Sequence, residues 1–223
     1  MVNLNSKAPS VAIVDYGMGN LFSVQAACAA AGLDATITAA PGDLDRADGV
    51  ILPGVGAFGE AMRRLREQRM DAAVRGFVES GRPFLAICLG LQLLFDTSEE
   101  FGSSEGLRIL SGRVVRFPAE GVGKVPEIGW NRIQLASPRL ASDWAAPALT
   151  GIHSGEYFYF VHSYFVEPLD RTYIATTTQY GDVLYASSVT WRNVFACQFH
   201  PERSGPAGLR IYRNFAETLR RRG

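Results

Sequence analysis

The chain has 223 residues, enough to bury a substantial core without disulfides or a structural metal. It carries 22 basic and 22 acidic side chains, so its formal net charge is zero, and 47% of its residues are hydrophobic. A balanced charge argues against nucleic-acid binding, which usually shows a basic excess. No apolar run reaches the roughly 18 residues of a spanning helix, so no membrane association is expected.

Residues 1–10 are polar and lack the apolar stretch of a signal peptide. We therefore expect a short polar extension followed by one domain over residues 11–223. The chain has three cysteines, an odd number at no metal-like spacing, which favours reduced thiols in the cytoplasm.

The first half of the chain alternates short apolar runs with helical segments. Apolar runs at 11–14, 50–52 and 83–88 predict strands. Helices are expected over 21–31, 57–68, 71–80 and 89–95. Apolar strands that alternate with helices predict a parallel sheet covered on both faces.

The second half has a different character. Residues 107–198 are rich in Tyr, Phe, Val and Thr and are interrupted by Gly and Pro, which suggests antiparallel strands. Residues 206–222 resemble a closing helix. The prediction is a single α/β domain with a largely parallel central sheet flanked by helices and antiparallel strands in the C-terminal half.

The candidate nucleophile is Cys88, which ends the third apolar run within Ala86-Ile87-Cys88-Leu89-Gly90. Small residues two positions before and after a nucleophile are typical of a strained strand-to-helix elbow. The following helix directs its N-terminal dipole at the sulfur and favours a thiolate. Cys28, in an Ala-rich helix, and Cys197, in an apolar run, are interpreted as structural.

A cysteine nucleophile usually needs a base, and the chain has three histidines. His200 follows an apolar run, and Glu202 lies two residues on, where an extended chain would point it the same way. His162, in an aromatic strand, is the rival: a buried structural histidine, or a residue that binds substrate through its local backbone. His153 lies in a polar loop and is interpreted as a surface residue.

Acyl chemistry also needs hydrogen-bond donors for an oxyanion. Pro53-Gly54-Val55-Gly56 follows the second apolar run and offers backbone N–H groups that glycine can present in unusual conformations. The sequence lacks the Lys-Ser or Lys-Thr of a phosphate-binding loop. Leu89, the residue after the nucleophile, is expected to supply a second N–H.

Together these motifs resemble the class I glutamine amidotransferase family. The shared features are the 53–56 loop, the elbow at 86–90 with Gln92 four residues after the cysteine, and His200-Pro201-Glu202. The resemblance implies a Cys88–His200–Glu202 triad that hydrolyses glutamine without a metal or organic cofactor. It further implies that Gln92 and the backbone around Ser163 and Tyr164 hold the substrate.

Within that family, other segments resemble the branch formed by the glutaminase subunits of imidazole glycerol phosphate synthases. These segments are 15–20, 52–58, 124–126 with 129–131, 157–164 and 198–205. The resemblance implies a heterodimer with a (β/α)8-barrel cyclase, which uses the ammonia to make imidazole glycerol phosphate and AICAR in histidine biosynthesis.

The same resemblance places the partner interface and the allosteric contacts at Asn20, Lys124, Pro126, Trp130 and Arg203. Arg203 stands where some relatives have Lys, which keeps the charge but changes its shape. Leu91 stands where Met is common, a nearly volume-conserving difference. We also expect the 53–56 loop to switch a carbonyl for an N–H group when the partner holds its ligand.

Three alternatives remain open at this point. The chain could be a sister amidotransferase that feeds a different synthase. It could be a cysteine peptidase or general hydrolase, which would show no preference for glutamine. It could also be a catalytically inactive binding subunit, although intact Cys88, His200 and Glu202 argue against that.

Overall fold

The computed structural model describes residues 8–136 and 147–222. Its helices are α1 (Leu21–Ala30), α2 (Pro41–Leu44), α3 (Phe58–Glu67), α4 (Met70–Glu79), α5 (Leu89–Leu93) and α6 (Gly205–Arg222), with 3-10 helices η1 (Pro147–Leu149), η2 (Arg171–Tyr173) and η3 (Pro201–Arg203). The strands of the first half are β1 (Ser10–Val14), β2 (Asp34–Thr38), β3 (Gly49–Leu52), β4 (Phe84–Ile87), β5 (Thr97–Ser98) and β6 (Ser104–Glu105). Those of the second half are β7 (Gly112–Arg116), β8 (Glu127–Arg132), β9 (Gln134–Leu135), β10 (Tyr157–His162), β11 (Tyr164–Pro168), β12 (Ile174–Tyr180), β13 (Val183–Trp191) and β14 (Val194–Cys197).

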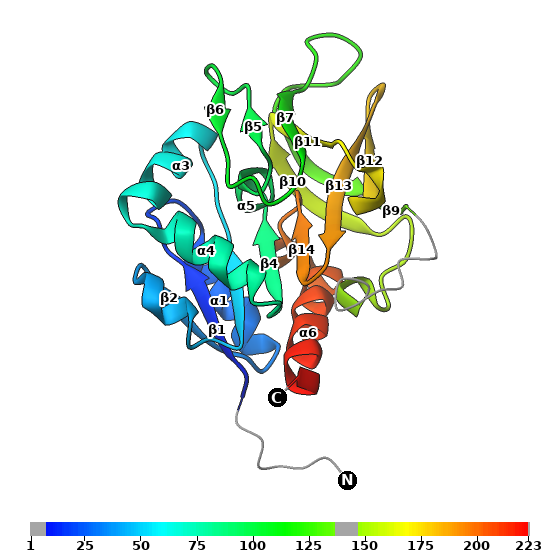
Figure 1. Ribbon diagram of the computed structural model, residues 1–223. Helices are drawn as coiled ribbons and strands as arrows, with labels where there is room; N and C mark the ends of the chain where they lie inside the picture. Colours follow the sequence, from blue (N-terminus) through cyan, green and yellow to red (C-terminus); the bar gives the residue numbers. More distant parts are fainter. Residues whose placement is uncertain (1–7, 137–146, 223) are drawn as a thin grey trace.

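Most of these strands join one mixed sheet (Figure 1). Its parallel part runs in the order β2-β1-β3-β4-β14, and antiparallel strands β13, β11 and β7 continue from β14. The predicted fold class is therefore confirmed. The chain's return to the sheet centre with β14 places the last parallel strand directly beside β4.

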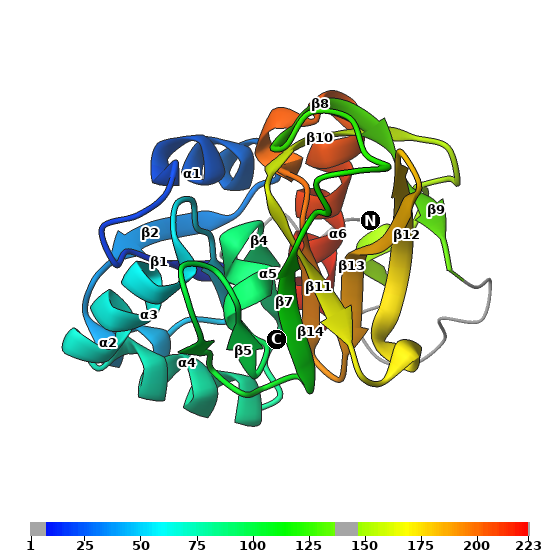
Figure 2. The same ribbon diagram turned by 90° about the horizontal axis from the view of Figure 1, so that it is seen from above.

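Helices cover both faces of the parallel strands, as the continuous apolar runs predict. Val11 and Ile13 of β1 pack in the same core cluster as α1 and α6, whereas Ala12 and Val14 pack in the cluster that contains α3 and α4. Figure 2, seen from above, shows α1 and α6 on one side of the sheet and α3 and α4 on the other.

Four elements of the first half were not predicted, namely α2 and the strands β2, β5 and β6. Strand β2 is the edge strand of the sheet, and its sequence Asp-Ala-Thr-Ile-Thr is only partly buried. An edge strand needs no continuous apolar run, so its pattern resembles a loop. Within the described residues, no helix is long and apolar enough to cross a membrane.

The pairing register brings three strand ends to one edge. Leu52 of β3 aligns with Ala86 of β4, and Cys197 of β14 aligns with Ile87. The residues that follow these strands therefore emerge next to one another. A separate antiparallel pair, β8 and β10, lies beside this edge, and β10 continues into β11 through Ser163.

A matched pair of glycines tests the packing of η3 against α6. A methyl group at Gly208 would lie 1.9 Å from the carbonyl oxygen of Pro201, whereas one at Gly76 in α4 meets nothing within 4 Å. We expect Gly208→Ala to lower the free energy of unfolding by about 1–3 kcal/mol through overpacking. Gly76→Ala should raise it by about 0.5–1 kcal/mol, since alanine favours helices. Urea unfolding measures both, and equal effects would contradict this packing.

Candidate active site

Cys88 lies at the turn between β4 and α5 in a strained backbone conformation. Its φ is 55° and its ψ is −112°, a region that non-glycine residues rarely occupy. Its N–H group donates a 2.7 Å hydrogen bond to the Cys197 carbonyl. A side chain at Gly90 would place its Cβ 1.9 Å from the Leu52 carbonyl oxygen, so the elbow requires glycine there.

His200 and Glu202 occupy the neighbouring strand end, after β14. The Nδ1 of His200 lies 2.8 Å from Oε1 of Glu202, and both side chains are buried. Ser204 fixes this turn, because its hydroxyl donates to the His200 carbonyl at 2.6 Å and accepts from the Tyr159 N–H at 3.0 Å. The His200 N–H in turn donates to the Tyr159 carbonyl. The turn is thus attached to β10 on both sides.

The charge environment favours a protonated ring at His200. Burial lowers the pKa of His200, but the adjacent Cys88 and Glu202 outweigh it and raise the pKa to about 10. The Nε2 atom is buried and has no hydrogen-bond partner in the described part of the chain. This geometry leaves Nε2 free to exchange a proton with the sulfur.

The 53–56 loop lies against the elbow. The hydroxyl of Tyr16, a buried side chain after β1, donates to the Pro53 carbonyl at 2.9 Å. Burial and the nearby Cys88 raise the pKa of Tyr16, so the hydroxyl keeps its proton. Gly54 is buried, and a Cβ there would lie 2.1 Å from the Tyr16 hydroxyl. The Leu89 N–H, which the sequence suggested as an oxyanion donor, points instead to the Gly54 carbonyl at 3.3 Å.

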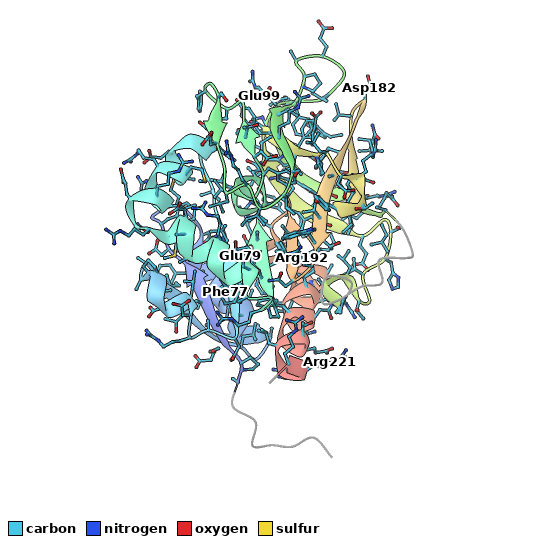
Figure 3. All side chains as sticks on the ribbon, in the orientation of Figure 1. Phe77, Glu79, Glu99, Asp182, Arg192 and Arg221 are labelled. Carbon is cyan, nitrogen blue, oxygen red and sulfur yellow. The ribbon has the colours of Figure 1, made fainter. Side chains whose placement is uncertain are left out.

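A cavity of about 390 Å³ opens above Cys88. Seven of the predicted site residues line it: Val55, Gly56, Cys88, Leu89, Gln92, Ser163 and Tyr164. Pro126, which the sequence placed at the interface, lines it as well. A volume of this size suits a small metabolite. Figure 3 shows Glu99, next in sequence to the cavity-lining Glu100, at the opposite end of the molecule from Arg221 of α6.

Sequence reasoning missed Glu100 and Gln198. Glu100 lines the cavity, and its Oε2 accepts a 2.6 Å hydrogen bond from the Phe58 N–H at the start of α3. Gln198 is fully buried, and its Nε2 lies 3.6 Å from the Cys88 sulfur. No local pattern marks Glu100, because it follows the elbow through a polar loop. Gln198 falls inside the 198–205 motif, but the motif gives no reason to assign it a role.

The ring of His162 bonds groups other than Cys88. Its Nδ1 contacts the Tyr164 carbonyl at 2.9 Å, and its Nε2 lies 3.2 Å from the Tyr185 hydroxyl and 3.3 Å from Glu127. Glu127 is itself buried and accepts hydrogen bonds from Tyr185 and Asn131. Both ring nitrogens are thus engaged away from the sulfur, and the geometry supports His200 over His162 as the base. His162 nevertheless is one of the residues that line the cavity.

Two of the predicted interface residues, Trp130 and Arg203, lie at the β8–β10 pair. Trp130 is 56% exposed and packs edge-on against Tyr159, and the Arg203 guanidinium lies 4.2 Å from the centre of the Tyr159 ring. Asn20 is exposed at the start of α1, and Lys124 is exposed before β8. In Figure 2, α1, β8 and β10 lie along the same side of the molecule.

The remaining cysteines and His153 are not among the residues that line the cavity. Cys28 and Cys197 are fully buried in the core, where burial raises the pKa of both thiols. His153 is exposed in the loop before β10. These positions agree with the structural and surface interpretations from the sequence.

The ionisation of His200 can be tested directly. NMR titration of the His200 ring should give a pKa of about 10, and Glu202→Gln should lower it by removing a negative partner. Because this pKa exceeds the ordinary 6.5, the stabilisation is complete below pH 6.5 and is lost as pH rises towards 10. Glu217→Gln, on the exposed face of α6, is the matched control. A pKa near 6.5 in the unaltered protein would contradict the assignment.

The chain is similar to known proteins over most of its length. Residues 12–219 match the family described as glutamine amidotransferase class-I. A relative from Syntrophotalea carbinolica, the imidazole glycerol phosphate synthase subunit HisH, is 49% identical over 93% of this chain and 99% of its own length. The HisH subunit of Moorella thermoacetica is 47% identical over 96% of this chain and 97% of its own.

Solved structures share the fold at lower identity. The structure of PurLQS from Thermotoga maritima superimposes with a TM-score of 0.73 at 18% identity, covering 96% of this chain and 100% of that one. The crystal structure of a glutamine amidotransferase gives a TM-score of 0.70 at 20% identity, covering 94% of this chain and 98% of that one. From the family match over most of its length, this chain belongs to the class I glutamine amidotransferases.

Proposed function

We propose that the chain hydrolyses glutamine to glutamate and ammonia as the glutaminase subunit of an imidazole glycerol phosphate synthase. The observation that carries this proposal is the position of Cys88 and His200 on adjacent strand ends beside a cavity of metabolite size. Similarity over nearly the whole chain to two subunits named HisH favours this branch over sister amidotransferases.

The reaction starts from a Cys88 thiolate beside a protonated His200 ring, the ion pair that forms when the sulfur gives its proton to Nε2. The thiolate attacks the side-chain amide carbon of glutamine, and the carbonyl oxygen becomes an oxyanion. His200 then returns the proton to the departing nitrogen, which leaves as ammonia. Glu202 keeps Nδ1 of the ring engaged and stabilises the imidazolium, as the carboxylate of a triad does.

Water completes the cycle. The remaining γ-glutamyl thioester on Cys88 is attacked by a water molecule that His200 deprotonates, and glutamate departs as the sulfur is restored. The raised pKa of His200 suits the step in which it donates a proton to the leaving group. No metal or organic cofactor is required by any of these steps.

The cavity walls offer complementary groups for the two ends of glutamine. Glu100 supplies a carboxylate for the α-ammonium group, with Oε1 available while Oε2 holds the Phe58 N–H. The backbone at Ser163 and Tyr164 lies at the corner between β10 and β11 and provides polar groups for the α-carboxylate.

The loop at Pro53–Gly56 gives the enzyme a conformational switch. With the Gly54 carbonyl bonded to the Leu89 N–H, that donor is unavailable to an oxyanion. Loss of one oxyanion donor lowers a rate by about 10²–10³. A partner that rotates this peptide would release the Leu89 N–H and speed hydrolysis, so the free subunit is expected to be slow.

The partner is a (β/α)8-barrel cyclase that docks over the outer side of β8 and β10. Ile128, Trp130 and Tyr157 are exposed there, and we name these three residues the apolar face. Aromatic residues and arginine are enriched among the residues that dominate binding energy at interfaces. Ammonia then passes to the cyclase, which makes imidazole glycerol phosphate and AICAR. The three free thiols fit a cytoplasmic enzyme.

The decisive experiment measures ammonia and glutamate released from glutamine, with and without the cognate cyclase and its nucleotide ligand. We expect stimulation of about 10²-fold or more from one regained oxyanion donor. The Cys88→Ala variant should release no ammonia or glutamate but should bind the cyclase normally. Full activity in the free subunit would contradict the switch, and turnover of peptides or esters without glutamine preference would favour a general hydrolase.

Truncation of the apolar face should weaken the complex without affecting the fold. Trp130→Ala is expected to raise the dissociation constant of the cyclase by about 30-fold, which corresponds to about 2 kcal/mol for an aromatic residue buried at an interface. The control is Leu184→Ala on β13. Leu184 is also apolar and is 59% exposed, close to the 56% of Trp130. Calorimetry measures both, and an unchanged constant for Trp130→Ala would move the interface elsewhere.

A further inference from the structure

Gln198 contacts the proposed nucleophile, Cys88, and lies outside both the triad and the cavity lining. It follows β14 and is fully buried. Its backbone N–H donates to the Ser187 carbonyl at 2.9 Å, which fixes its main chain. Its side-chain amide lies between two polar neighbours, with Oε1 3.0 Å from Nε2 of Gln92 and Nε2 3.6 Å from the Cys88 sulfur.

The donors and acceptors around the Gln92 and Gln198 side chains fix the orientation of both amides. The Tyr164 carbonyl can only accept, so the Gln92 atom 2.9 Å from it must be the NH₂ group. The second hydrogen of that group meets Gln198, whose facing atom must therefore be oxygen. The other end of the Gln198 amide, the NH₂ group, is then the end that faces the sulfur.

Further hydrogen bonds hold the Tyr164 carbonyl, which accepts from Gln92. His162 Nδ1 also lies 2.9 Å from the Tyr164 carbonyl, so that oxygen accepts from two side chains. Glu127 and Tyr185 engage the other nitrogen of His162. Because these groups are buried, reversing either amide would place donor against donor or acceptor against acceptor, which would cost considerable free energy.

An N–H donor at the sulfur distinguishes the two ionisation states of Cys88. The thiol can direct its proton to the Val161 carbonyl, which lies 4.0 Å away and cannot stabilise a negative sulfur. The Gln198 N–H instead gains strength when the sulfur is ionised, because hydrogen bonds to charged acceptors are about twice as strong as neutral ones. The two contacts therefore favour opposite states of the nucleophile.

We propose that Gln198 is a further catalytic residue, whose Nε2–H stabilises the Cys88 thiolate and orients it for attack, held in place by Gln92. This inference rests on the proposed role of Cys88. It also narrows the role of Gln92, since both of its amide hydrogens are used within the protein. Only Oε1 of Gln92 remains for substrate, so it accepts a hydrogen bond from glutamine and cannot bind the carboxylate.

The test compares the rate of Cys88 alkylation by iodoacetamide across pH in Gln198→Met, Gln198→Glu and the unaltered protein. Met keeps the length of the side chain without the donor, and Glu replaces the donor with a negative group. The titratable groups coupled to this sulfur are His200, Tyr16 and Cys197, and none of the variants alters them.

We expect Gln198→Met to alkylate about tenfold more slowly at neutral pH, with its profile displaced by about one pH unit to the alkaline side. Gln198→Glu should slow alkylation more than Gln198→Met does. The kcat for glutamine should also fall more in Gln198→Glu than in Gln198→Met. Gln25→Met is the control, because it removes a side-chain amide donor in the same way, here the one that bonds the Ala35 carbonyl, but at a position on α1. An alkylation profile for Gln198→Met that matches the unaltered protein would overturn the inference.

Two further measurements separate the possible failures. If Cys88→Ala retains glutaminase activity, the proposed function fails together with this inference. If Cys88→Ala is inactive while both Gln198 variants alkylate normally, only the role of Gln198 fails. Should a variant not fold, NMR of the side-chain amides in the unaltered protein decides. The Gln198 NH₂ signals should move when Cys88 becomes Ala, and unmoved signals would overturn the proposal.

Discussion

The close approach of the elbow backbone to the end of β3 is the constraint on which the rest of the site depends. With no side chain at Gly90, the first turn of α5 can sit against the Leu52 carbonyl. That contact brings Leu89 within hydrogen-bond distance of Gly54 and places Cys88 beside the 53–56 loop. It also holds Cys88 at a positive φ, which a freely hinged turn would relax. The positions of the proposed nucleophile and of the proposed oxyanion loop therefore depend on one packing contact.

A second organising feature is a network of buried polar side chains that extends from β8 to the Cys88 sulfur. Glu127 contacts His162, His162 and Gln92 meet at the Tyr164 carbonyl, and Gln92 orients Gln198. Burial and the Glu127 carboxylate raise the pKa of Tyr185 well above its ordinary value, so its hydroxyl remains a donor to Glu127. Glu127, the first residue of this network, lies on β8, the strand that also carries Trp130 of the apolar face. The surface proposed for the partner and the nucleophile thus belong to one continuous set of contacts.

The sequence predicted the parallel half of the sheet and the candidate triad for the same physical reason. Central parallel strands are apolar on both faces, and ligand-binding residues gather after their carboxyl ends, so Cys88, His200 and the 53–56 loop could be recognised from the local sequence. Strand β2 was missed because an edge strand is only partly buried and lacks that pattern. Glu100 and Gln198 were missed because their roles arise from contacts between distant segments. Gln198, for example, meets Gln92 across 106 positions of the chain.

The orientation of the Leu89 amide was likewise beyond the sequence. A glycine-rich loop permits either its N–H or its carbonyl to face the elbow, and only the folded backbone shows the Gly54 carbonyl there. The same local sequence is compatible with both orientations, which is what a switch requires.

The central claim is that Cys88 forms a covalent intermediate with glutamine, and the most direct measurement is mass spectrometry of the complex quenched during turnover. Peptide mapping should find a γ-glutamyl thioester on the peptide that contains Cys88, and no adduct in Cys88→Ala. An adduct on Cys28 or Cys197 instead, or glutamine hydrolysis that persists in Cys88→Ala, would contradict this account of the enzyme.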